Sequence, residues 1–208
     1  LYAFGKSPNE ILDFFKSVYF FNWKHFTLTK PGFINSDIFR LYLKPIIGEI
    51  KIKDLKKELI INATDLIQGE TFVFSGDDYL LDAIIASCSV PGLASPFKKD
   101  ELLLSDGGIL NNFPTNLIKE KCDKIIGIYV CPLQDVKKNQ LNSIKSVATR
   151  AYELLSHSVE NYKFRDCDWL ISPKELSNYG MFESKKTRMD ELFQLGFSEA
   201  EKTFPKDF

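Results

Sequence analysis

The apolar and polar positions of the chain form two alternating patterns. Short unbroken apolar runs, typical of strands covered on both faces, predict strands at residues 59–64 and 124–130. Shorter runs predict strands at residues 70–74, 102–104 and 169–171. Apolar positions three or four residues apart predict helices at residues 8–18, 37–43, 79–87, 114–120, 143–162 and 189–202. This alternation predicts an α/β sandwich with a mostly parallel sheet.

Two helix boundaries have specific signals. Ser7, Pro8 and Glu10 have the spacing of a capping box with proline at the first helical position. Pro45 is expected to end the helix that follows Ser36 or Asp37, because proline cannot donate the next hydrogen bond.

The segment from Tyr19 to Phe33 is densely aromatic. It could be a lid that contacts acyl chains or a membrane, or a loop packed on the core. We favour the packed loop, because aromatic side chains gain large burial energies wherever they lie.

Length and charge narrow the class of protein. The 208 residues are 44% hydrophobic, enough for one core, which predicts a single domain over residues 1–208. With 27 basic and 28 acidic residues, the chain has no basic excess for binding nucleic acid. No apolar run approaches the roughly 18–20 residues that span a bilayer. The sequence begins without Met, so it does not decide whether a signal peptide precedes it.

The cysteines and histidines do not form a metal-binding pattern. The four cysteines make no CxxC pair, and the two histidines, His25 and His157, are far apart, so no metal is expected. Each cysteine is in or beside an apolar segment, which favours buried thiols in a reducing, cytoplasmic compartment, with two disulfides as the alternative. The cysteines are Cys88, Cys122, Cys131 and Cys167.

The strand at residues 102–104 leads into Asp106, which is followed by Gly107 and Gly108. A carboxylate at the end of a buried strand lies where open α/β sheets place their ligands and chemistry. The two glycines allow a sharp turn and a close approach to a substrate. Alone, Asp-Gly is also a common turn pair.

Three motifs in order resemble those of the patatin-like phospholipase family. They are NATDL at residues 62–66 with GE at 69–70, ASCSVPG at 86–92 with PF at 96–97, and SDGGILNNFP at 105–114. The resemblance runs from residue 1 to about residue 135. It implies a three-layer α/β/α sandwich and a lipid acyl hydrolase that uses a serine-aspartate dyad without histidine, cofactor or metal. The implied substrate is a phospholipid or related acyl ester, reached by transient contact with a membrane interface.

The resemblance also assigns roles to residues. Asp106 matches the aspartate of the dyad, and Gly107, Gly108, Asn111 and Asn112 match the loop that shapes the site. The two asparagines could hold this loop or merely occupy turn positions. Asp65 could likewise shape the site from a neighbouring strand end or start the turn before Gly69.

The other half of the family's active site is absent from these 208 residues. They contain no GxSxG motif and no glycine-rich oxyanion loop, and both are expected to precede Leu1 together with the first strands. We therefore expect a serine esterase in a longer gene product, and whether this chain alone is an enzyme stays open. Ser87 and Ser89 are weak substitutes as nucleophile. The alternative is a non-catalytic lipid-binding or interaction protein, cytoplasmic or peripheral at membranes, of undetermined oligomeric state.

Overall fold

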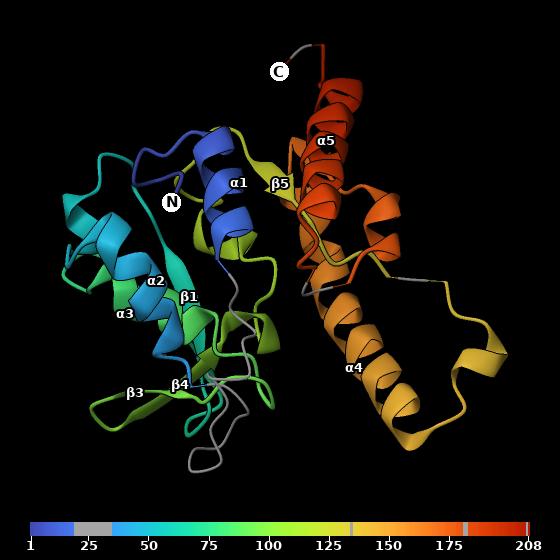
Figure 1. The fold of residues 1–208 in the computed structure, drawn as a ribbon, viewed down its shortest axis with the longest axis horizontal. Coiled ribbons are helices and arrows are strands. Elements are labelled where there is room, and N and C mark those ends of the chain that lie inside the picture. The colour runs from blue at the N-terminus through green and yellow to red at the C-terminus, as the bar shows by residue number, and fades with distance from the viewer. Residues whose placement is uncertain (19–34, 134, 181–182, 207) are drawn as a thin grey trace. The chain divides into compact units, whose positions relative to one another are not determined.

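The computed structural model describes residues 1–18, 35–133, 135–180, 183–206 and 208. It divides into two compact units, residues Leu1–Asn112 and Phe113–Phe208, which are described separately (Figure 1). The single domain over residues 1–208 stays a prediction. The aromatic segment from Tyr19 to Phe33, including His25, lies outside the described residues, and so does the lid interpretation.

The first unit is built on a four-stranded sheet in the order β2-β1-β4-β3. The strands are β1 (Ile61–Asp65), β2 (Glu70–Phe74), β3 (Phe97–Lys99) and β4 (Leu102–Asp106). The helices of this unit are α1 (Pro8–Ser17), α2 (Ile38–Ile47) and α3 (Leu80–Ser87), with the 3₁₀ turns η2 (Ile52–Asp54) and η3 (Gly107–Ile109).

The mostly parallel sheet is not confirmed, because every strand pair of this sheet is antiparallel. Residues 66–69 join β1 to β2, and residues 100–101 join β3 to β4. Connections this short produce hairpins, since a parallel pair needs a crossover of a dozen or more residues. Asp100 has a φ of 50°, as a two-residue hairpin turn requires.

The core of the first unit lies between the sheet and α3. Helix α3 packs against β1 and β4, and α2 packs on α3 (Figure 1). Phe74, Leu81 and Leu104 are fully buried there. This packing holds the carboxyl end of β4 beside the turn that follows α3, where Asp106 lies.

The predicted helix boundaries are partly confirmed. Ser7 caps α1, with Glu10 completing the capping box. Pro45, however, lies inside α2, which continues to Ile47, so it does not end the helix as expected. The helix ends at Gly48, whose φ of 66° is in the left-handed region that favours glycine.

The second unit contains a two-stranded parallel sheet and two long helices. Its elements are β5 (Ile126–Ile128), β6 (Trp169–Ile171), α4 (Ile144–Glu160) and α5 (Lys186–Thr203), with the 3₁₀ turns η4 (Thr115–Leu117), η5 (Lys138–Gln140), η6 (Asn161–Asp166) and η7 (Lys174–Asn178). The strand predicted at residues 169–171 and the long helix after Ser143 are confirmed.

Two predictions in this unit are wrong in part. The helix expected at residues 114–120 is only the short turn η4, a segment with few apolar residues to pack. β5 is buried on one face only, whereas its unbroken apolar run predicts burial on both faces. Apolar character along a strand does not reveal which faces are covered. Ile125, Gly127 and Tyr129 are buried, whereas Ile126, Ile128 and Val130 are exposed.

A buried ion pair lies at the end of α4. The side chains of Glu160 and Lys163 are 2% and 5% exposed, and the Lys163 Nζ lies 2.8 Å from the Glu160 Oε2. The same oxygen accepts the N–H of Phe113 at 3.0 Å. The Phe113 ring packs edge-on against Tyr129 and Phe164. The pair therefore fixes the start of the second unit against its aromatic core.

The cysteines differ from the expectation. None of the four described cysteines is in a disulfide, and Cys88, Cys122 and Cys131 are exposed, so the expectation of buried thiols is wrong for these three. Apolar neighbours along the sequence do not determine which side chain faces solvent. Separately, every helix in the described part of the chain is too short or too polar to cross a membrane.

Candidate active site

Asp106 lies at the carboxyl end of β4, as the sequence predicts. In the antiparallel register it faces Ala63 of β1, and Ser105 faces Thr64. Directly opposed residues present their side chains on one face of a sheet, and the next pair on the other. Ala63 and Asp106 therefore share one face, and Thr64 and Ser105 share the opposite face.

Two residues hold the main chain of Asp106. Its N–H donates to the carbonyl oxygen of Ser89, in the turn after α3, at 3.0 Å. Its carbonyl oxygen accepts the hydroxyl of Thr64, on β1, at 2.9 Å. The Ser105 hydroxyl also donates to the Ser89 carbonyl at 2.6 Å. The strand end is thus fixed from both sides before its side chain makes any contact.

The carboxylate of Asp106 turns back onto its own loop. Its Oδ1 accepts the N–H of Gly108 at 2.7 Å. The side chain is half-buried, and this desolvation raises the pKa of Asp106 above its ordinary value, although the Gly108 N–H opposes the rise. A carboxylate with a raised pKa accepts a proton more readily than an ordinary aspartate does.

The Asp-Gly-Gly loop passes very close to β1. A Cβ on Gly107 would lie 2.5 Å from both the carbonyl oxygen and the Nδ2 of Asn62. A Cβ on Gly108 would lie 2.9 Å from the Asn112 Oδ1 and 3.0 Å from the Asp106 Oδ1. Position 107 therefore needs glycine for space against the main chain of β1, and position 108 for space beside the carboxylate.

We expect Gly107→Ala to destabilise the chain by about 1–3 kcal/mol, the usual cost of forcing extra atoms into a packed site. The new methyl would overlap a main-chain atom, which cannot turn away as a flexible side chain would. Urea unfolding monitored by circular dichroism measures the change. Gly196→Ala on α5 is the control, since nothing lies within 4 Å of its added Cβ. Equal stability of Gly107→Ala and the original chain would contradict the close approach.

The asparagines of the loop are placed differently from each other. Asn111 is buried, and its N–H donates to the Gly107 carbonyl at 2.9 Å. The Asn111 carbonyl accepts the Asn62 Nδ2–H at 2.9 Å, and this amide also lies 3.3 Å from the Gly107 carbonyl. Asn112 presents its Oδ1 to Gly108. Sequence reasoning missed Asn62 and Thr64, although their spacing of two along one strand puts them on one face.

Asp65 belongs to a turn. Its Oδ1 accepts the N–H of Ile67 at 2.9 Å, and its carbonyl accepts the N–H of Gly69. It faces Leu104 in the register, two residues before Asp106. The geometry favours the interpretation in which Asp65 starts the turn before Gly69.

The alternative nucleophiles and the histidine have structural surroundings. Ser89 is fully buried, and its hydroxyl donates to the Ile85 carbonyl at 2.7 Å. Ser87 is the last residue of α3. His157 lies in α4 with its ring 6.2 Å from that of Tyr129, and its buried Nδ1 has no hydrogen-bond partner within the described residues. None of the three stands on a nucleophile elbow.

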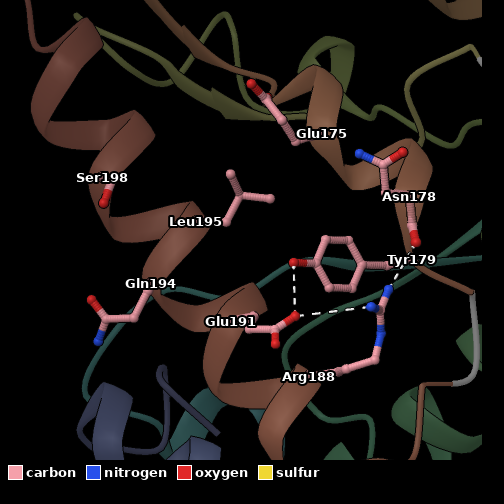
Figure 2. Close-up of a pocket in the computed structure, with 8 residues that line it drawn as sticks. All are labelled: Glu175, Asn178, Tyr179, Arg188, Glu191, Gln194, Leu195 and Ser198. Atoms are coloured by element: carbon pink, nitrogen blue, oxygen red, sulfur yellow. Dashed lines mark hydrogen bonds and ion pairs between the residues drawn. The ribbon is translucent and has the colours of Figure 1, made fainter.

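A separate open cleft of about 540 Å³ lies in the second unit between η7 and α5. Figure 2 shows Tyr179, Arg188 and Glu191 pointing toward one another within it. The Arg188 Nε donates to Glu183 at 2.7 Å, and its Nη2 donates to the Asn178 carbonyl at 2.8 Å. The guanidinium also lies 4.3 Å from the centre of the Tyr179 ring. This cleft contains none of the predicted site residues, and its arginine is engaged in holding η7 to α5.

Within the described ranges, no cluster of three or more histidine, cysteine, aspartate or glutamate side chains could hold a metal ion. The expected absence of a cofactor stays a prediction.

The strands and helices define an α/β protein. Its Asp-Gly-Gly loop holds one carboxylate, that of Asp106, at the end of a strand. A family model described as patatin-like phospholipase matches residues 1–118, more than half of the 208 residues. The chain belongs to the patatin-like phospholipase family, which at the family level consists of lipid acyl hydrolases. The resemblance predicted from the three motifs is confirmed.

Two curated relatives from Mycobacterium tuberculosis, the uncharacterized NTE family proteins Rv2565 and Rv1063c, are each 33% identical to the chain. The similarity to Rv2565 covers 84 residues, 40% of this chain and 14% of the relative. The similarity to Rv1063c covers 89 residues, 42% of this chain and 24% of the relative. The chain thus matches only a minor part of the length of these relatives.

Proposed function

We propose that this chain is the aspartate-bearing part of a lipid acyl hydrolase that cleaves acyl esters of phospholipids through a serine-aspartate dyad. The observation that carries the proposal is the fixed carboxylate of Asp106. It lies at a strand end and is held through its N–H, its carbonyl and its Oδ1. The substrate, a transient contact with a membrane interface and a cytoplasmic or peripheral location remain parts of this proposal.

In the proposed reaction Asp106 accepts the proton of a serine hydroxyl while the serine oxygen attacks the ester carbonyl carbon. When the ester bond breaks, the same proton passes to the leaving alcohol oxygen, and water then releases the acyl group from the serine. The serine and the oxyanion donors would come from a GxSxG segment and a glycine-rich loop upstream of Leu1, since residues 1–208 contain neither.

The proposal also includes the finer fold, a three-layer α/β/α sandwich with a mostly parallel sheet. The parallel pairing of β5 with β6 supports it. The antiparallel hairpins of residues 61–106 are compatible with this fold, because mixed sheets commonly carry antiparallel strands.

Ester hydrolysis tests this function directly. We would compare the 208-residue chain, a chain extended upstream to the start of its reading frame, and the Asp106→Asn variant of the longer chain, on a short-chain p-nitrophenyl ester. Activity of the longer chain alone, abolished by the substitution, is the expected result. Activity of the 208-residue chain itself would contradict the missing-serine argument and direct attention to Ser87 and Ser89. A folded but inactive longer chain would favour a non-catalytic lipid-binding or interaction protein.

The pH dependence of the longer chain should show the raised pKa of Asp106. The base must be unprotonated to accept the serine proton, so kcat/KM should fall as pH decreases through the Asp106 pKa. Desolvation raises that pKa, which places the acidic limb above the ordinary aspartate value of about 3.9. A pH-rate profile on a substrate without ionisable groups measures it. A limb at or below the ordinary value would show that the burial of Asp106 does not control the reaction.

A further inference from the structure

We propose that Asn62 and Thr64, two alternate residues of β1, are positioning residues that fix the catalytic geometry of Asp106 from the face of the sheet opposite its carboxylate. The inference rests on the proposed function for its catalytic meaning. Its structural content is the geometry of residues 62–64 and 106–111.

The two side chains hold successive parts of one turn. The Thr64 hydroxyl donates to the carbonyl of Asp106 at 2.9 Å. The Asn62 amide donates to the next carbonyl, that of Gly107, at 3.3 Å and to the Asn111 carbonyl at 2.9 Å. Together they bind both ends of the short turn that carries the carboxylate.

Their face of the sheet separates them from the chemistry. Ala63 is directly opposite Asp106, so strand alternation puts Asn62 and Thr64 on the other face, with Ser105. Thr64 is only 2% exposed. Neither side chain therefore reaches a substrate that approaches the carboxylate, and any effect on the reaction passes through the main chain of residues 106–107.

Gly107 has no Cβ, and this allows the Asn62 amide to approach, because a Cβ at position 107 would lie 2.5 Å from the Asn62 Nδ2. If the turn shifts, the Gly108 N–H moves with it relative to the Asp106 Oδ1, to which it donates at 2.7 Å. The same displacement changes both the position of the base and the hydrogen bond that stabilises its charged form.

The test uses Asn62→Ala, Thr64→Val and the conservative Thr64→Ser. In the longer chain we expect the first two to lower kcat by about 10- to 100-fold with little change in KM, as a small misplacement of a catalytic group does. The carboxyl pKa of Asp106, followed by ¹³C NMR in the 208-residue chain, should rise further as the Gly108 bond weakens. Thr64→Ser keeps the hydroxyl and should restore both values.

The matched control is Thr71→Val. Thr71 faces Thr64 across the β1–β2 pair but is exposed and lies on the strand away from β4. Variants that lose stability while keeping kcat and the Asp106 titration of the original chain would overturn the inference, and so would a shifted titration with unchanged kcat. A shifted Asp106 titration in these variants, together with a longer chain that hydrolyses no ester, would support the positioning of the carboxylate and overturn the proposed function instead.

Discussion

Replacing Asp106 by asparagine should remove ester hydrolysis from the longer chain while leaving it folded. The amide keeps the shape of the carboxyl group, and its oxygen can still accept the Gly108 N–H that Oδ1 accepts at 2.7 Å. An amide cannot take the serine proton, however. Loss of a general base typically costs about 10²- to 10⁴-fold in rate. At about 1.4 kcal/mol for each factor of ten, this is roughly 3–5 kcal/mol of the activation barrier.

Steady-state hydrolysis at neutral pH, with circular dichroism to confirm folding, measures this effect. Asp65→Asn is the matched control, because Asp65 is a buried aspartate on the adjacent strand whose Oδ1 accepts the Ile67 N–H. An asparagine oxygen can make that turn bond equally well. Equal losses in the two variants would show that the effect comes from disturbing the sheet and would remove Asp106 from the dyad.

The largest stability effect is expected in the second unit, for Lys163→Met. The Glu160 carboxylate is 2% exposed and lies 2.8 Å from the Lys163 Nζ, so the substitution removes a cation that compensates a deeply buried charge. Breaking such a pair typically costs about 3–5 kcal/mol. The Phe113 N–H still donates to Glu160, but a main-chain dipole offsets a full charge only in part.

Urea unfolding monitored by circular dichroism provides the measurement. The control is Lys119→Met, because Lys119 lies 3.8 Å from Asp166 with side chains 45% and 28% exposed, and an exposed pair of this kind contributes about 1 kcal/mol or less. The double variant Glu160→Gln with Lys163→Met removes both charges and should recover part of the loss. A loss for Lys163→Met no larger than that of the control would mean that water reaches the pair.

Local signals in the sequence predicted local structure well. The capping box at Ser7 and the strand leading to Asp106 depend on neighbouring residues, and both occur as expected. Pro45 misled because one missing hydrogen bond is tolerated near a helix end. The alternation of strands and helices predicts a mostly parallel sheet. This prediction overlooks the hairpins, because it does not weigh how short the connections at residues 66–69 and 100–101 are.

The candidate site shows a similar division. Asp106 and its glycines could be located from the sequence, because a carboxylate and two glycines after an apolar strand form a continuous signal. The contacts of Asn62 and Thr64 with the loop could not, since they join residues more than forty positions apart through the register of β1 and β4. Register depends on which faces of the strands are buried, and hydropathy alone does not give this.

The close approach at Gly107 has a genetic consequence. Every glycine codon begins with GG, and any single base change at either of those positions encodes a residue with a Cβ or ends translation. At position 107 each such residue would meet the main chain of Asn62, whereas at Gly196 the added atom would meet open space. Random coding changes should therefore be eliminated at codon 107 and often retained at codon 196, so selection alone, and not a low mutation rate, would preserve the loop beside Asp106.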